Sequence, residues 1–311
     1  MQAVTQIRFD GKRALVTGAG KGIGRDVCLL LHQCGAEIVA ISRSKEDLES
    51  LSKEIPCQTI AVDLENVEEV KKAVESIGQI DLLVNNAGIA SLAPFLETKL
   101  EDYERVMNVN VRQVVVVSQI VAKGMVERKK GGTIVNVSSQ ASSVAIAEHT
   151  SYCTSKGALD QLTRMMALEL GPHNVRVNAV NPTVTLTPMG EFAWSEKSKA
   201  EPMLAKIPLG RFAKPREVSN VIAFLLSDLS SMSRHPLVIT LDDSAIDGIC
   251  VHEDRRLRRL NARFVLVNKR RGVRQIFAQL GTGRLHSGGK SFATPHDQRR
   301  HARDTTEPPD L

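Results

Sequence analysis

The 311-residue sequence is poor in cysteine and in aromatic residues, and it has no long apolar run. Its five cysteines are irregularly spaced, with no C-x-x-C pair and no Cys/His cluster of metal-binding type. This argues against a zinc site and indicates a reducing compartment. Residues 1–12 contain no apolar segment of signal-peptide type, and no apolar run reaches membrane-spanning length. We therefore expect a soluble, cytoplasmic protein with no transmembrane segment and no bound metal.

Charge is unevenly distributed along the chain. Residues 233–311 hold 15 Lys and Arg against 9 Asp and Glu, which accounts for the whole net charge of +6. We expect a folded domain over 1–232 and a divergent, Arg-rich tail over 233–311 that is largely disordered, since its residues follow no sustained period. Such a tail could bind RNA or an anionic membrane, or simply be solvated. Because aromatic residues are almost absent from it, nucleic acid is not an expected partner.

Apolar strand-like runs alternate with segments of helical periodicity through residues 1–232. The predicted strands are 14–16, 37–41, 59–62, 81–84, 133–137 and 175–180. The predicted helices are 22–33, 45–54, 67–77, 100–128, 151–170 and 217–226. This alternation predicts an α/β fold, a Rossmann-like, doubly wound parallel sheet in a single domain. Ligands in such sheets bind beyond the carboxyl ends of the strands. Four polar motifs fall at predicted strand ends: Thr17-Gly18, Asn85-Asn86-Ala87-Gly88, Ser138-Ser139 and Asn181-Pro182.

Tyr152 and Lys156 lie one turn apart on the predicted helix 151–170, which places the phenol and the ammonium on one face. A free tyrosine, with a pKa of about 10, exchanges protons poorly at neutral pH. A neighbouring cation stabilises the phenolate and lowers this pKa, which favours acid–base catalysis. Such a pair also occurs by chance on exposed helices. Ser139, at a predicted strand end, would offer a hydroxyl to a substrate, or would merely cap the strand.

A glycine-rich loop with the pattern T-G-x-x-x-G-x-G follows the first predicted strand and opens the first helix. Glycines let the backbone approach a pyrophosphate, and a helix N-terminus favours its negative charge. The alternative is a flexible turn. The pattern predicts a dinucleotide site whose contacts are Gly18, Gly22, Ile23 and Gly24.

The residues after the second predicted strand indicate which dinucleotide is bound. NAD-selective sites place a carboxylate there for the ribose 2′-hydroxyl. This chain has Ser42-Arg43 instead, and Lys21 lies in the glycine loop. Two cations and a hydroxyl favour a 2′-phosphate, and hence NADPH, unless both cations are only solvated. Asp63 would accept a hydrogen bond from the adenine amine, or else cap the following helix.

The ordered set of these motifs, together with Asn110, resembles the short-chain dehydrogenase/reductase family. Within it, residues 7–232 resemble the L-xylulose (dicarbonyl) reductases and related tetrameric carbonyl reductases. The resemblance implies NADPH-dependent reduction of a small ketone, ketose or dicarbonyl, such as L-xylulose or diacetyl, by a homotetramer.

The resemblance also implies roles for individual residues. Tyr152 would protonate the carbonyl oxygen, and Lys156 would bind the nicotinamide ribose and lower the pKa of Tyr152. Ser139 would donate to the substrate oxygen, and Asn110 would hold a water that continues a proton relay. Further cofactor contacts would be Leu64, Asn86, Ala87, Gly88, Val184 and Thr187. The substrate contacts would be Gln140, His149 and Trp194, for which surface capping or core packing is the alternative.

The resemblance ends after Met232, where family members continue into a last parallel strand that packs at a subunit interface. Residues 237–241 could replace this strand; otherwise the edge of the strand 175–180 would be exposed and assembly weakened. Two alternatives therefore stay open. The chain could be an inactive or assembly-deficient cofactor-binding protein, or a 3-oxoacyl carrier-protein-type reductase with the same catalytic residues.

Overall fold

Seven parallel strands form one sheet in the computed structural model, which describes residues 7–232 and 238–240. The strands lie in the order β3-β2-β1-β4-β5-β6-β7, so the chain winds outward from β1 in both directions. This is the doubly wound arrangement predicted from the sequence. The strands are β1 (Arg13–Thr17), β2 (Glu37–Ser42), β3 (Cys57–Ala61), β4 (Leu82–Asn85), β5 (Gly132–Val137), β6 (Val175–Asn181) and β7 (Val238–Thr240).

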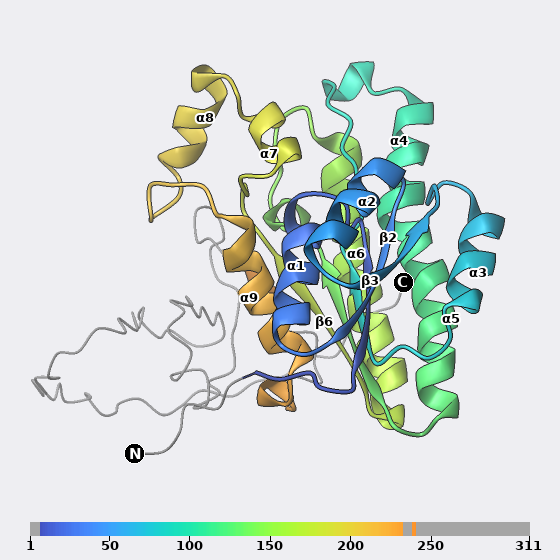
Figure 1. The fold of residues 1–311 in the computed structure, drawn as a ribbon. Coiled ribbons are helices and arrows are strands. Elements are labelled where there is room, and N and C mark those ends of the chain that lie inside the picture. The colour runs from blue at the N-terminus through green and yellow to red at the C-terminus, as the bar shows by residue number, and fades with distance from the viewer. Residues whose placement is uncertain (1–6, 233–237, 241–311) are drawn as a thin grey trace, which may run out of the picture.

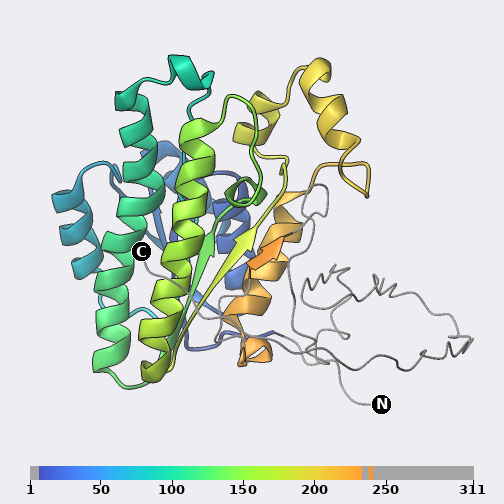
Figure 2. The same ribbon diagram turned by 180° about the vertical axis from the view of Figure 1, so that it is seen from behind.

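Helices cover both faces of the sheet (Figures 1 and 2). Helices α1, α2 and α9 pack on one face, and α3, α5 and α6 pack on the other. Their bounds are α1 (Gly22–Gln33), α2 (Lys45–Glu54), α3 (Val67–Ser76), α4 (Leu100–Met107), α5 (Gln113–Glu127), α6 (Thr150–Leu170), α7 (Pro188–Ala193), α8 (Lys197–Leu204) and α9 (Pro215–Leu226). The predicted α/β class is confirmed.

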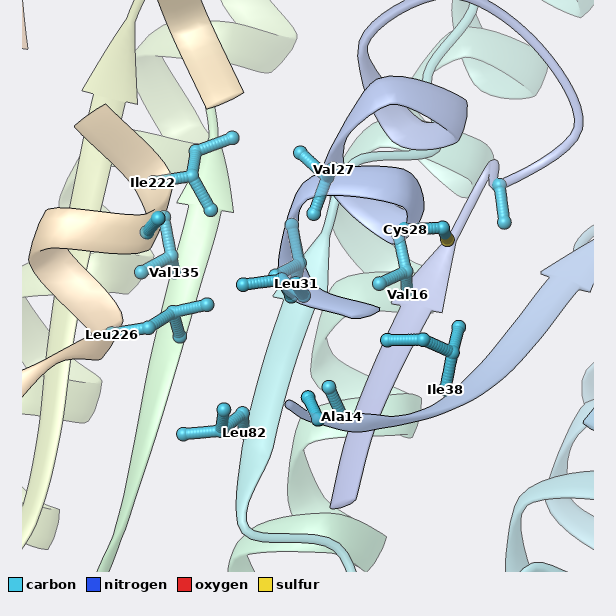
Figure 3. Close-up of a cluster of buried hydrophobic side chains, with 14 of the residues drawn as sticks. Ala14, Val16, Val27, Cys28, Leu31, Ile38, Leu82, Val135, Ile222 and Leu226 are labelled. Atoms are coloured by element: carbon cyan, nitrogen blue, oxygen red, sulfur yellow. The ribbon is translucent and has the colours of Figure 1, made fainter. Parts of the chain in front are cut away.

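The core on the first face is drawn in Figure 3. Leu31 of α1 and Ile222 of α9 pack over the apolar side chains of β1, β4 and β5. Every residue of β4 is buried, because helices cover it from both sides. Leu31 is fully buried, so truncating it to alanine would cost about 2–5 kcal/mol of stability.

The predicted helix 100–128 is interrupted in the structure. Between α4 and α5 lies a π-helical segment, Asn108–Arg112, in which the amide of Gln113 donates to the carbonyl of Asn108. The prediction of one continuous helix is therefore wrong at this point. The apolar period of the sequence runs through the segment without a break, so it carries no signal for the extra residue in the turn. Asn110 lies in the middle of this segment.

The short strand β7 pairs in parallel with β6, from Ala179 opposite Val238 to Asn181 opposite Thr240. The expectation that residues 237–241 could supply a last strand is confirmed for Val238–Thr240, and the edge of β6 is paired there. The remainder of 233–311 lies outside the described residues, and the prediction of a disordered tail falls on it.

Among the described residues, one helical run, Leu100–Glu127, is long and apolar enough to cross a membrane. Half of its most apolar 18-residue window is buried inside the fold. The core helix of a globular domain has the same length and composition, so this run is weak evidence for a membrane span.

Candidate active site

The predicted polar motifs meet at one edge of the sheet. In the parallel register, Asn85 of β4 lies opposite Asn136 of β5, and Val137 of β5 lies opposite Val180 of β6. The strands therefore end together, and α7 and α8 project beyond this edge (Figures 1 and 2).

The glycine loop forms a cradle that has no room for side chains. Gly18 has φ of +66°, and a Cβ there would lie 2.8 Å from the Cα of Ala87. A Cβ on Gly24 would collide with the carbonyl oxygen of Gly18 and with the side chain of Asn86. Both positions bring bare backbone to the N-terminus of α1, which is the surface that a pyrophosphate needs. The residues present therefore fit a dinucleotide.

Hydrogen bonds join the cradle to the end of β4. The hydroxyl of Thr17 accepts from the amides of Asn86 and Ala87, at 3.1 and 3.2 Å. The side-chain amide of Asn86 donates back to the carbonyls of Thr17 and Gly18, at 3.0 and 3.1 Å. Three of the predicted cofactor residues are thus held together by direct contacts.

The opposite wall of the cradle comes from the segment after β6. Gly22 has φ of +57°, and a Cβ there would lie 3.0 Å from the methyl group of Thr187. The Thr187 hydroxyl caps α7 by accepting from the amide of Gly190 at 3.1 Å. Val184 is buried at the base of the same segment, and Ile23 packs partly against the core beneath the cradle. These predicted contacts therefore lie on both sides of the glycine loop.

The cations of the predicted 2′-phosphate subsite face two acids, of which Asp47 was not predicted from the sequence. Lys21 forms an ion pair with Asp47 at 3.2 Å, and Arg43 lies 3.9 Å from the carboxylate of Asp63. The Lys21 and Arg43 side chains are 65 % and 66 % exposed. A Cβ on Gly20 would lie 2.8 Å from the Cβ of Asp47.

The carboxylate of Asp47 was missed because only the end of β2 was considered. Ser44 caps α2 by accepting from the amide of Asp47 at 3.1 Å. This cap turns the third helical residue back toward the glycine loop. A Cβ on Gly20 would also lie 2.9 Å from the hydroxyl of Ser42, so the loop, the strand end and the helix start converge.

Asp63 does not cap the following helix. Its carboxylate accepts from the amide of Glu65 at 3.0 Å, whereas the N-cap of α3 is Asn66, which accepts from Glu69. The alternative reading of Asp63 as an N-cap is therefore wrong. Leu64 packs partly against the core of the second face.

Arg25 links the glycine loop to α2. Its guanidinium donates at 3.2 Å to the carbonyl of Gly20 and at 3.2 Å to the carbonyl of Asp47. It also donates to the Ser50 hydroxyl at 3.0 Å and pairs with Glu54. Because its side chain is only 20 % exposed, Arg25 fixes the two segments that carry the charged residues of the subsite.

Lys156 lies buried between the strand ends. Its ammonium donates to the carbonyl of Val137 at 2.9 Å and lies 5.5 Å from the centroid of the Tyr152 ring. A Cβ on Gly88 would lie 3.5 Å from this ammonium and 3.3 Å from the side-chain oxygen of Asn110. Four predicted site residues therefore gather around one small volume.

Asn110 is completely buried, and its side chain is fully used in structural contacts. Its oxygen accepts from the amide of Ile89, and its nitrogen donates to the carbonyl of Ile89 and to Ser155, each at 2.9 Å. Both hydrogens of this side-chain amide are thus already donated within the protein.

Tyr152 faces Ser139, but its acidity differs from the expectation. Burial raises the pKa of Tyr152, while a side-chain hydrogen bond with Ser139 acts to lower it. Tyr152 as a whole is partly buried. The prediction that Lys156 lowers this pKa is therefore wrong for the protein groups alone, because desolvation is larger than any charge effect here.

Burial also acts on the ammonium. It lowers the pKa of Lys156 to about 8, and the negative charge of Asp160 opposes the shift. Sequence analysis missed Asp160, which lies one turn further along α6 and is 4 % exposed. Its i,i+4 spacing from Lys156 was the available signal.

Two of the predicted substrate residues lie next to the catalytic candidates. Gln140 follows Ser139 and is 6 % exposed, so the alternative of a surface cap is wrong for it. The ring of His149 lies edge-on to Tyr152, with 6.3 Å between centroids. Trp194, at the end of α7, packs against Phe212 at a centroid distance of 6.3 Å.

A glycine cradle beside a partly buried phenol, a buried hydroxyl and a buried ammonium defines the site of a dinucleotide-dependent oxidoreductase. Residues 18–235 match the family model described as "Enoyl-(Acyl carrier protein) reductase". The chain belongs to the short-chain dehydrogenase/reductase family. It uses a nicotinamide cofactor.

Individual relatives show which members of the family this chain is similar to. The chain is 56 % identical over 228 residues to bovine L-xylulose reductase, covering 73 % of this chain and 93 % of that protein. It is 50 % identical over 227 residues to pig carbonyl reductase [NADPH] 2, with 73 % and 93 % covered. The crystal structure of a putative NAD(P)-dependent gluconate 5-dehydrogenase from Beutenbergia cavernae, with bound NADP, superposes with a TM-score of 0.72 at 30 % identity. That match covers 76 % of this chain and 98 % of the other.

Proposed function

We propose that the protein reduces a small ketone, ketose or dicarbonyl of the L-xylulose or diacetyl type, with NADPH as cofactor and Tyr152 as proton donor. The observation that carries the proposal is the convergence of Tyr152, Ser139 and Lys156 beside the glycine cradle. The similarity to proteins named L-xylulose reductase and carbonyl reductase [NADPH] 2 supports the substrate class.

The proposed mechanism places each proton on a defined atom. The Ser139 oxygen accepts from the amide of Ala141 at 3.1 Å, and its O–H, which is now shared with Tyr152, would turn to donate to a carbonyl oxygen. Tyr152 then transfers its phenolic proton to that oxygen. The phenol holds this proton at neutral pH, but burial raises its pKa, so the transfer depends on a nearby cation that stabilises the phenolate as it forms.

Lys156 completes the proposed site. The nicotinamide group supplies the hydride when it is bound. The Lys156 ammonium would bind its ribose hydroxyls and stabilise the phenolate that forms as Tyr152 gives up its proton. A water held near Asn110 would return a proton to the phenolate. Gln140, His149 and Trp194 would contact the substrate.

The proposed preference for NADPH rests on Lys21, Ser42 and Arg43. Both cations are exposed toward the loop that would hold the adenosine ribose, and they can exchange their present carboxylate partners for a 2′-phosphate. Arginine and lysine both bind phosphate well in such loops. Gly18, Gly22, Ile23 and Gly24 would hold the pyrophosphate, and Asp63, Leu64, Asn86, Ala87, Gly88, Val184 and Thr187 would line the rest of the cofactor site.

The two tyrosines of the described residues offer a matched test. NADPH oxidation should be measured with diacetyl, L-xylulose and a 3-oxoacyl thioester for the wild type, Tyr152→Phe and Tyr103→Phe. We expect Tyr152→Phe to lose about 10²–10⁴-fold in kcat while still binding NADPH, and Tyr103→Phe to match the wild type. Full activity in Tyr152→Phe would refute the mechanism.

The same substrate panel separates the substrate classes. The family model is described as an enoyl-(acyl carrier protein) reductase, so a thioester is the second candidate substrate. Faster turnover of the thioester than of either small carbonyl would favour the acyl carrier-protein class. No turnover of any carbonyl by a chain that binds NADPH would support the inactive protein instead. A sedimentation or light-scattering mass on the same sample tests the proposed tetramer.

A further inference from the structure

Asp160 is a buried carboxylate directly behind the proposed catalytic residues. Its Oδ2 accepts from the side-chain amide of Asn181 at 2.9 Å, and its Oδ1 is fully buried with no hydrogen-bond partner among the described residues. Burying a carboxylate with one oxygen unpartnered is unfavourable for stability. The presence of a carboxylate at this buried position is therefore better explained by the charge of Asp160 than by its packing.

The charge of Asp160 acts on Lys156, one turn earlier on α6. Asp160 lies four residues after Lys156 on α6, which places the two side chains on one face of the helix, and its negative charge opposes the lowering of the Lys156 pKa by burial. The other groups around the lysine are uncharged at neutral pH. They are the phenol of Tyr152 on the same helix, the carbonyl of Val137 from β5, Gly88 after β4, and the amide of Asn110 from the π-helical segment. Asp160 therefore supplies the local counter-charge for the buried lysine.

Asp160 also contacts the segment that carries Ser139. The Asn181 side-chain nitrogen that donates to Asp160 also lies 3.0 Å from the carbonyl oxygen of Ser139 and 2.9 Å from the hydroxyl of Ser142, so its two hydrogens are shared among three acceptors. Asn181 is the last residue of β6 and is 1 % exposed. The Asp160 carboxylate thus contacts Asn181, which holds the carbonyl of Ser139. It also acts electrostatically on the Lys156 ammonium.

We propose that Asp160 is a positioning residue for the carbonyl reduction, which keeps Lys156 in its ammonium form and, through Asn181, holds Ser139 toward the substrate oxygen. The inference rests on the proposed function, since it assigns Lys156 and Ser139 their roles there. Its alternative is that Asp160 only stabilises the polar interior between α6 and β6. The two differ in one respect: a purely structural carboxylate would not set the pH dependence of the site.

The test compares variants that keep or remove the charge. Asp160→Asn and Asp160→Ser remove it and retain an acceptor for Asn181, whereas Asp160→Glu retains it. Glu169→Gln, at an exposed position of the same helix, is the matched control. For each variant that folds by circular dichroism, NADPH affinity and kcat should be measured between pH 6 and pH 10. Having two charge-free variants keeps the test decisive if one of them does not fold.

In the wild type, NADPH binding should weaken as the pH rises through about 8, the pKa of Lys156. In the charge-free variants this midpoint should move down by about one pH unit, and kcat at pH 7.5 should fall by about threefold as the ammonium fraction falls. Asp160→Glu should keep the midpoint near that of the wild type, and Glu169→Gln should change nothing. An unchanged midpoint in a folded, charge-free variant would overturn the inference. Since binding is measured without turnover, an inactive wild type would refute the proposed function and leave this result interpretable.

Discussion

The two lysines of the site are held in opposite ways. Lys156 is buried, its ammonium bonds to a main-chain carbonyl, and its counter-charge is a buried carboxylate. Lys21 is 65 % exposed and pairs with Asp47 on the surface. The first arrangement fixes geometry and protonation, so small changes there should have large effects. The second is screened by water and can exchange partners, so changes there should adjust cofactor preference in modest steps.

The largest effect should come from the glycine cradle, which lies between the surroundings of Lys156 and those of Lys21. Gly24→Ala introduces a Cβ that collides with the carbonyl of Gly18 and the side chain of Asn86, so the loop cannot close as it does now. We expect NADPH affinity, measured by fluorescence titration, to fall by at least about 100-fold, together with a lower Tm. Gly171→Ala is the control, because its Cβ would meet nothing within 4 Å. Wild-type affinity in Gly24→Ala would contradict the placement of the pyrophosphate.

A smaller effect on cofactor binding is expected at the exposed cations Lys21 and Arg43. Arg43→Ala removes one of the two cations and should weaken NADPH binding by roughly tenfold while leaving NADH binding nearly unchanged. Asp47→Asn should act in the opposite direction, because it removes the acid that competes for Lys21. The ratio of the two dissociation constants, measured at fixed ionic strength, checks both. If neither variant alters the ratio, the 2′-phosphate does not bind at this subsite.

The smallest effect concerns stability in acid. Glu217 accepts from Arg211 at 2.6 and 2.8 Å and from the amide of Lys214 at 2.9 Å, which lowers its pKa to about 2. Because the folded pKa lies below the usual value of 4.5, the carboxylate stabilises the fold above that value. This contribution is lost as the pH falls toward 2.

Glu217→Gln should therefore lower the free energy of unfolding at pH 7 by less than about 1 kcal/mol, since the pair is half exposed. The difference from the wild type should shrink between pH 4.5 and pH 2. Urea unfolding at a series of pH values measures it. The control is Glu49→Gln, whose ion pair with Lys45 is 3.9 Å long and more exposed. An equal loss of stability in both variants would mean that the hydrogen bonds of Glu217 at the start of α9 contribute no more than an exposed ion pair.

The spacing of apolar residues predicted most of the helices and strands, because each element places apolar side chains at regular intervals on the face that it buries in the core. The bounds of α1 and α2 agree with the prediction to the residue. The interruption at Asn108–Arg112 could not be predicted, since it changes hydrogen bonding and leaves the apolar pattern intact. The strand Val238–Thr240 was only an alternative at the sequence level, because nothing around it follows a sustained period.

The candidate site was predictable where a motif follows a strand, since parallel strands bring their ends together. Asp47 and Asp160 were missed for a different reason. Each lies in a helix, and its relation to the site depends on how that helix is turned by a cap or packed against a strand end. The pKa of Tyr152 was predicted in the wrong direction because spacing reveals a neighbouring cation but not the amount of water removed.

Arg25 has a consequence for redesign. Its guanidinium bonds at once to the carbonyl of Gly20 and to that of Asp47, so the glycine loop and the start of α2 behave as one piece. Exchanging the β2–α2 segment to change the cofactor preference would therefore also disturb the loop proposed to hold the pyrophosphate. A graft that keeps Arg25, Ser50 and Glu54 and changes only the outward side chains of Ser42, Arg43 and Lys21 avoids that coupling.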